Sequence, residues 1–268
     1  MKLSRVLKTA LAVLALAPAL AWAAPPVPGD PGQGVAATAH DFTGGVMGTP
    51  NAGTVGVCTY CHTPHKAIST LLLWNHTLSS SNFSWDVPTT TAGTPFATFV
   101  GNTYKGPTTK CLSCHDGTVA VGDIAWFKEA ARTVGSTDGV YNTFKLGSDG
   151  DTSHVIGATG GVAGAMGGNH PVAMPYSFNQ AKNTYNSKVG GDGLVLTEWV
   201  AQPAAPIRLF NDNAGAISAG AVAGKTGIEC SSCHDPHNKA AVDVNFLRGK
   251  LTGSTQADGY LCVQCHIK

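Results

Sequence analysis

Eight cysteines carry most of the chemistry available to this sequence, and all of them fall in four segments of one form. Each segment is Cys-X-X-Cys-His, and the four end at His62, His115, His234 and His266. The cysteines are Cys58, Cys61, Cys111, Cys114, Cys230, Cys233, Cys262 and Cys265. In this spacing, two thiols can add to the two vinyl groups of one haem while the adjacent histidine binds the iron. The sequence therefore predicts four covalently attached haems with these histidines as proximal ligands.

Disulfides, zinc binding and redox dithiols are the alternative interpretations of the cysteines. Exported proteins commonly form disulfides, and Cys-X-X-Cys units can bind zinc or act as redox pairs. None of these roles requires a histidine directly after the second cysteine. With 10 histidines in 268 residues, four such placements would arise by chance with a probability of roughly two in a million. We therefore expect haem attachment.

Six further histidines are candidates for the distal side of the irons. They are His40, His65, His76, His154, His170 and His237. A second histidine closes an iron to other ligands, whereas an open position permits catalysis and a methionine raises the reduction potential. The competing methionines, apart from the initiator, are Met47, Met166 and Met174. We expect histidine on both sides of all four irons.

A repeated phrase follows motifs one and three, His62-Thr-Pro-His65 and His234-Asp-Pro-His237. The second histidine of each phrase is too close in sequence to the proximal ligand to reach the opposite face of the same haem. The intervening proline fixes its own φ and restricts the residue before it, which limits where the chain can go. His65 and His237 are therefore expected to reach a neighbouring haem; the alternative is a surface histidine in a proline turn.

The other four candidates differ in their sequence context. His76 follows the mainly apolar residues 71–75, which could press against a porphyrin face, and His170 precedes a proline in a glycine-rich segment. His40 stands early in the chain and could serve its own subunit or a neighbouring one. His154 has the weakest context for a role at the iron. A purely structural histidine is the alternative for each.

The N-terminal residues predict export. Basic residues precede an apolar run over residues 10–20 and a small-residue cleavage site, so we interpret residues 1–24 as a signal peptide, with a retained anchor as the alternative. Nothing later in the sequence is apolar enough to span a bilayer. With 12% charged residues and a net charge of +1, the chain has no basic surface for nucleic acid.

Residues 25–268 are expected to form a single tetrahaem domain. Haems one and two would lie in 58–115, a loop-rich insertion in 116–229, and haems three and four in 230–268. The chain has 33 glycines, 15 prolines and only 7% aromatic residues, a composition that favours weak folding unless bulky cofactors fill the interior. We therefore predict mostly irregular coil with short helices, little β structure and a core built from haem.

The sequence further predicts three short elements between motifs two and three. Apolar spacing favours a helix over residues 123–132, with Asp123 as its N-cap, and alternating apolar residues favour strands over 194–200 and 207–210.

The sequence resembles the secreted multihaem c-type cytochromes of metal-respiring bacteria, including tetrahaem members that polymerise into extracellular filaments, or nanowires. The shared phrases run through nearly the whole mature chain: His40-Asp-Phe, Cys61-His62-Thr-Pro-His65, Leu73-Trp-Asn-His76, Cys114-His115-Asp-Gly, Asn169-His170-Pro, Cys233-His234-Asp-Pro-His237 and Leu261-Cys-Val-Gln-Cys-His266. The chain departs from that group in having His154 and a long glycine-rich loop before His170.

The resemblance implies electron transfer through closely spaced bis-histidine haems rather than enzyme catalysis. In filament-forming members the haem chain continues into the next subunit, and His40 is the residue here that would ligate a neighbour's haem. The implied partners are copies of the same chain, redox cytochromes of the cell envelope, and external acceptors such as metal oxides or other cells. The implied location is extracellular or at the cell surface.

Two other functions remain alternatives at this point. A monomeric periplasmic or surface shuttle would use the same haems. A multihaem oxyanion reductase would need an open iron with acid or base groups nearby, and no such constellation is evident in the sequence.

The predicted distal ligands can be tested by substitution. His76→Ala or His170→Ala is expected to leave one iron high-spin while all four haems stay attached, because the proximal histidine and both thioethers remain. Absorption spectra of the purified variants report the spin state. Fully low-spin spectra in both variants would show that other residues are the distal ligands.

Overall fold

The computed structural model describes residues 27, 29–42, 56–64, 67, 71–85, 100, 101, 104, 106–124, 126, 127, 130, 131, 144–158, 161–190 and 195–267. The predicted signal peptide, His65 and Met47 lie outside these residues. No helix in the described ranges is long and apolar enough to cross a membrane.

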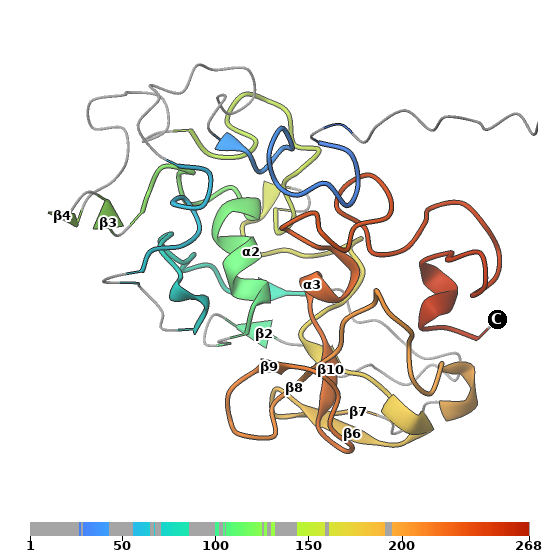
Figure 1. The fold of residues 1–268 in the computed structure, drawn as a ribbon. Coiled ribbons are helices and arrows are strands. Elements are labelled where there is room, and N and C mark those ends of the chain that lie inside the picture. Colours follow the sequence, from blue (N-terminus) through green and yellow to red (C-terminus); the bar gives the residue numbers. More distant parts are fainter. Residues whose placement is uncertain are drawn as a thin grey trace, which may run out of the picture.

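Regular secondary structure is short and sparse in the described residues (Figure 1). The helices are α2 (Thr108–His115) and α3 (Cys230–Cys233), and the 3-10 turns are η2 (Leu71–Leu73), η4 (Phe178–Gln180), η5 (Leu196–Glu198) and η6 (Cys262–Gln264). The strands are β1 (Phe83–Ser84), β2 (Val100–Gly101), β3 (Trp126–Phe127), β4 (Ala130–Ala131), β5 (Met174–Pro175), β6 (Asn183–Tyr185), β7 (Lys188–Gly190), β8 (Phe210–Asn211), β9 (Ser218–Ala219) and β10 (Thr226–Ile228). Much of the described backbone is therefore irregular.

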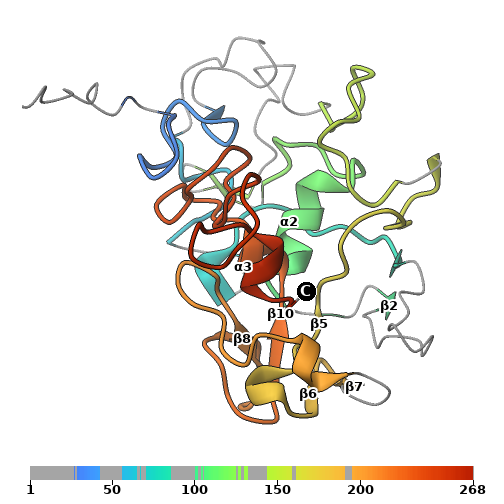
Figure 2. The same ribbon diagram turned by 90° about the vertical axis from the view of Figure 1, so that its right-hand side faces the viewer.

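The largest described sheet lies inside the segment 116–229. Its strands are antiparallel and run in the order β5-β10-β8-β9. Gly227, in the central strand β10, lies opposite Pro175 on one side and Phe210 on the other. A Cβ atom at Gly227 would lie 2.2 Å from Cδ1 of Tyr185, so glycine lets that ring pack directly on the strand. The strand β10 leads through Glu229 into α3, and the sheet thereby fixes where motif three begins (Figure 2).

The remaining strands form two-stranded antiparallel pairs: β1 with β2, β3 with β4, and β6 with β7. The pair β6·β7 also contacts β5 and β10, which extends the sheet region below α2 and α3 in Figure 1.

The predicted helix over residues 123–132 is wrong. The segment contains β3 and β4, which pair with each other. Asp123 does not act as a helix cap: its Oδ1 accepts a hydrogen bond from Thr77 Oγ1 at 3.0 Å, and its carbonyl accepts one from the Thr77 N–H at 2.9 Å. Pairing with the segment around Thr77 thus replaces the local hydrogen bonds on which a helix would depend.

The two predicted strands fare differently. Residues 194–200 contain the 3-10 turn η5, in which the Glu198 N–H donates to the Val195 carbonyl at 3.0 Å, so the strand prediction is wrong there. The predicted strand over residues 207–210 overlaps β8 only at Phe210.

Buried apolar side chains of the described residues form three clusters, each next to an attachment motif. The first comprises Tyr60, Val121 and Ile124, with Cys61 packed against it. The second comprises Phe83, Trp85, Tyr104, Leu112, Met166, Val172 and Ala173, with Cys230 at its edge. The third comprises Met174, Tyr176, Leu209 and Ile228, with Cys265 at its edge. The protein core is therefore distributed around the motifs.

The third cluster predicts a measurable stability effect. Leu209 is 8% exposed, and Leu209→Ala should lower the free energy of unfolding by about 2–5 kcal/mol, because it removes buried methyl groups and leaves a cavity. Leu251, 52% exposed, is the matched control, and Leu251→Ala should change stability by less than about 0.5 kcal/mol. Denaturant unfolding of the haem-loaded protein provides the comparison; equal effects would contradict the assigned packing.

Candidate haem sites

Each attachment motif forms one helical turn. The N–H of the motif histidine donates to the carbonyl of the first cysteine in motifs one, three and four, at 2.8 Å for His62, 3.0 Å for His234 and 3.0 Å for His266. Motif two forms the last turn of α2 and ends at His115. Because residues i and i+4 share a helix face, the turn brings the first cysteine and the imidazole to the same side. This arrangement suits one porphyrin per motif.

Cysteines of different motifs lie near one another. None of the eight forms a disulfide bond. The thiols of Cys111 and Cys230 lie close enough to perturb each other, and this proximity lowers the pKa of Cys111 and raises that of Cys230. Their helices α2 and α3 are in contact near the centre of the molecule in both views (Figures 1 and 2). Motifs two and three are therefore neighbours.

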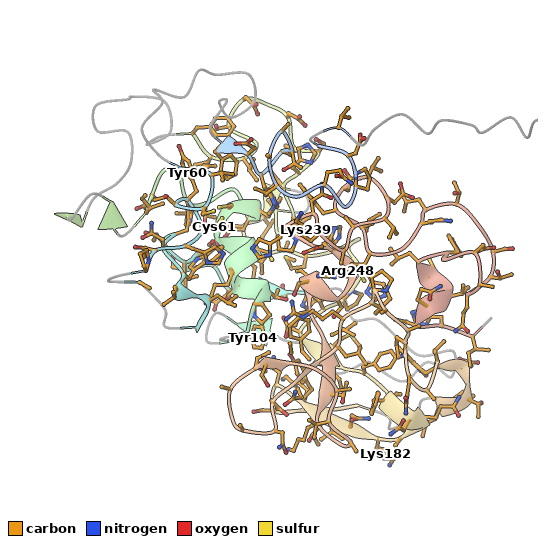
Figure 3. The ribbon with its side chains drawn as sticks, in the orientation of Figure 1. Tyr60, Cys61, Tyr104, Lys182, Lys239 and Arg248 are labelled. Carbon is orange, nitrogen blue, oxygen red and sulfur yellow. The ribbon has the colours of Figure 1, made fainter. Side chains whose placement is uncertain are left out.

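Two further contacts connect the outer motifs. Burial, followed by the nearby Cys61, raises the pKa of the Cys114 thiol, and Figure 3 shows Cys61 beside α2. At the other end, burial, then Cys230, then Cys262 raise the pKa of Cys233 to about 11. The motifs thus lie next to one another in the order one, two, three, four.

Three of the motif histidines face a second imidazole from a distant part of the chain. The ring centres are 6.0 Å apart in the pair His62–His237, 6.0 Å in His115–His40 and 6.2 Å in His266–His170. The ring planes meet at 23°, 64° and 57°, respectively. Two imidazoles bound on opposite sides of one metal ion, with metal–nitrogen bonds of about 2.0 Å, have ring centres about 6 Å apart. The distances between ring centres in the three pairs fit axial ligation of one iron each.

Backbone carbonyls orient most of these rings. The Nδ1–carbonyl distances are 2.6 Å for His62 and Leu72, 2.8 Å for His115 and His154, 2.8 Å for His234 and Asn245, 2.9 Å for His170 and Pro171, and 3.4 Å for His40 and Pro236. A hydrogen bond from Nδ1 fixes the ring and its tautomer, and leaves the Nε2 lone pair for a metal.

His40 is held at its position by packing as well as by this hydrogen bond. Its ring stacks on Phe246, with ring centres 4.5 Å apart and planes at 13°. Burial, and then the neighbouring His115, lower the pKa of His40 to about 4, while burial lowers the pKa of His115. Both rings are therefore neutral near pH 7, which is the form that binds a metal.

His234 is the motif histidine without an opposed imidazole in the part of the chain that the structure describes. Its Nδ1 is bonded to the Asn245 carbonyl, and it lies near His40 and His115, whose pKa values it lowers. His65, the other histidine of the repeated phrase, is outside the described residues.

His76 and His154 are arranged differently from the paired histidines. His76 is 1% exposed, with Nδ1 2.8 Å from the Thr77 carbonyl and Nε2 2.9 Å from the Ala120 carbonyl, so both nitrogens face acceptors. The side chain of His154 is exposed, and its backbone carbonyl orients His115. The structure brings neither ring opposite a motif histidine, so of the two substitutions proposed from the sequence, His170→Ala rather than His76→Ala is the one expected to leave an iron high-spin.

The surroundings of motif one fit a large apolar group with anionic substituents. Leu72 and Leu73 are 52% and 47% exposed beside His62. The indole N–H of Trp74 is buried without a hydrogen-bond partner among the described residues, although buried donors normally have one. The indole N–H of Trp85 is also unpartnered, but it lies in the second cluster, beside Cys230. A porphyrin at motif one would cover the leucines, and its propionates would supply an acceptor for the Trp74 indole. Trp74 also meets the His62 ring edge-on at 5.8 Å.

An ion pair holds the phrase that contains His234 and His237. Asp235 Oδ1 lies 3.4 Å from Arg248 Nη2, and both side chains are buried. Arg248 Nε lies 3.1 Å from the Ser231 carbonyl and 3.3 Å from that of His234. The N–H groups of residues 237, 239 and 240 donate to the Asp235 carboxylate. This network directs His237 away from its own motif and toward His62.

Sequence reasoning missed Arg248, Phe246 and Trp85, whereas Trp74 belongs to the segment that was expected to press against a porphyrin. Each missed residue acts through contacts between segments far apart in the chain, so no local pattern marks it. Asp235 could have been noticed, because an Asp-Pro turn often caps following N–H groups with its carboxylate.

Among the described side chains, no group of three or more His, Cys, Asp or Glu residues is arranged to hold a metal ion by itself.

No protein-family model matches the chain, and no curated protein matches it at a significant level. Its functional interpretation therefore depends on the motifs and on the geometry described above.

The paired geometry gives a sharp test. His237→Ala should convert the iron at motif one to a five-coordinate high-spin state, about one quarter of the haem in a four-haem protein, without loss of haem. His154→Ala, another exposed histidine, is the matched control and should leave the spectrum low-spin. Magnetic circular dichroism or electron paramagnetic resonance measures the fraction; an unchanged His237→Ala spectrum would refute the His62–His237 pair.

Proposed function

We propose that this protein transfers electrons through four covalently attached c-type haems with histidine on both sides of the iron. The single observation that carries the proposal is the set of three imidazole pairs with ring centres 6.0–6.2 Å apart, each joining a motif histidine to a distant one. Haem supplies the redox chemistry when bound. The protein's part is to fix the imidazoles, bury the cofactors and hold them close together.

The proximity of the motifs supports a continuous electron path. Contacts between cysteines connect motif one to two, two to three and three to four. Cofactors attached at these cysteines would lie next to each other in that order, so an electron could enter at either end. A continuous electron path of this kind would require neighbouring attachment sites, and the attachment helices α2 and α3 are in contact.

Closed irons favour transfer over catalysis. An oxyanion reductase needs an open axial position with acid or base groups beside it. Three motif histidines already face a second imidazole, and His65 is our candidate for the haem of motif three, by analogy with its counterpart His237, which faces motif one. We therefore propose no enzymatic activity.

Our proposal for the setting is an exported protein that works outside the cell or at its surface. It would act as a subunit of a homopolymeric filament, receiving electrons from envelope cytochromes and passing them to external acceptors such as metal oxides or other cells. A monomeric periplasmic or surface shuttle is the second candidate. The resemblance implied that His40 ligates a haem of a neighbouring subunit. The centre of its ring lies 6.0 Å from that of His115 in the same chain, which favours ligation of a haem within its own subunit.

Two measurements on one sample test this proposal. Protein purified from its native host should contain four haems by mass and haem assay, all low-spin, and electron microscopy should show filaments. Discrete particles with low-spin haem would select the shuttle. A high-spin fraction that binds cyanide or nitrite would support the reductase, and absence of covalent haem would refute the entire proposal.

A further inference from the structure

A single carboxyl group is completely buried between the helices that carry motifs two and three. Glu229 is 0% exposed and is the N-cap residue of α3. Its Oε2 accepts hydrogen bonds from the Thr108 N–H at 3.2 Å and, in a very short contact, from the Thr108 hydroxyl. Thr108 is the first residue of α2. One carboxyl therefore joins the starts of both attachment helices.

The other carboxyl oxygen begins a chain of hydroxyl groups. Oε1 of Glu229 accepts a hydrogen bond from the Tyr185 hydroxyl at 2.5 Å, and that hydroxyl lies 3.4 Å from the Tyr104 hydroxyl. Close packing of the Tyr185 ring on Gly227 holds it in this position. Burial raises the pKa of Tyr185, so its hydroxyl stays neutral and can relay a proton. Two hydroxyl groups that can pass on a proton therefore adjoin Glu229, and the outer one belongs to Tyr104, which is 6% exposed.

The ionisable groups around Glu229 provide no compensating cation at its oxygens. The ionisable groups on the elements around it are Tyr185 on β6, Tyr104, Cys111 and Lys110 on α2, Cys230 on α3, and Asp212, whose charge raises the pKa of Tyr185 after burial; the Lys110 ammonium interacts with Cys111. Within the described residues, Glu229 forms no ion pair. Burial raises the pKa of Glu229 well above its usual range, so without an added positive charge the group is a neutral acid.

The two haems attached at motif two, through Cys111, and at motif three, through Cys230, would supply that charge in a redox-dependent way. Cys230 is the residue next to Glu229, its N–H donates to the Thr108 hydroxyl at 3.2 Å, and its thiol lies close enough to that of Cys111 to shift its pKa. Oxidised iron carries one positive charge more than reduced iron, and a nearby positive charge favours a carboxylate. Ionisation of Glu229 should therefore follow the oxidation state at these two motifs.

We propose that Glu229 is a redox-linked proton site that couples proton uptake to electron arrival at motifs two and three. The inference rests on the proposed electron-transfer function. When a one-electron donor, an envelope cytochrome in the cell or dithionite in the test, reduces iron(III) to iron(II), the Glu229 carboxylate takes one proton from water. On oxidation the electron leaves to the acceptor and the proton returns to water. Charge in this buried region thus stays nearly constant.

The test is a spectroelectrochemical titration of the haem-loaded protein at a series of pH values. In the wild type, part of the titration should move to lower potential as pH rises, with a limit of about 59 mV per tenfold change in proton concentration for one proton per electron. Glu229→Gln keeps the size of the side chain but cannot ionise, and should lose that component. Glu198→Gln, at an exposed glutamate, is the matched control and should retain it.

The outcomes separate this inference from the proposed function. Four low-spin haems in Glu229→Gln with an unchanged pH dependence would overturn the proton site and leave electron transfer standing. A wild-type protein without haem would instead refute the proposed function.

If Glu229→Gln fails to load haem, infrared spectroscopy on a protein that retains Glu229 tests whether this carboxyl changes protonation with the redox state. A protein carrying Glu129→Gln and Glu198→Gln and labelled with ¹³C-glutamate has Glu229 as its one labelled glutamate. A labelled carboxylic acid band that grows on reduction and shifts in heavy water supports the proposal; a redox-independent band overturns it.

Discussion

The pairing of imidazoles from distant segments is the constraint on which the rest of this structure depends. In the proposed iron sites a ring centre lies about 6 Å from its partner, and each of the three observed pairs connects residues far apart in sequence, such as His40 and His115. Long regular elements are not needed to meet this requirement. Irregular segments are sufficient when a ring nitrogen is hydrogen-bonded to a backbone carbonyl, as in His62, His115 and His170.

Two buried polar centres support this arrangement in different ways. Arg248 and Asp235 form an ion pair that organises the backbone around His234 and His237, and breaking such a pair leaves an uncompensated buried charge. Glu229 instead works as a hydrogen-bonded acid between α2 and α3. The first centre fixes where an imidazole points, and the second fixes the distance between attachment turns. In our proposal, only the second responds to electron transfer.

The apolar interior fits a protein that buries a further large apolar group. Three small clusters, each beside an attachment motif, replace a single continuous core among the described residues. Exposed Leu72 and Leu73, together with the unpartnered indole of Trp74, lie where a large apolar group with acceptors would complete the packing. The sheet around β10 is the most conventional part of the fold, and it serves to position α3.

The sequence by itself determined the attachment motifs and their adjacent histidines, because that chemistry is local: five consecutive residues contain both thiols and the ring. It also limited the remaining histidine candidates for the distal side to six. It led to the expectation that His237 serves another motif, since proline geometry and chain length exclude its own.

Predictions from the local sequence pattern were wrong where a segment pairs with a distant one. The helix expected over residues 123–132 is an example, because the Asp123 side chain accepts a hydrogen bond from Thr77 instead of capping a helix. The partners of His40 and His170, the polar contacts of His76, and the burial of Glu229 and Arg248 were decided only by the tertiary structure. Each of these depends on a distance between segments separated by tens of residues or more, and sequence spacing does not encode such a distance.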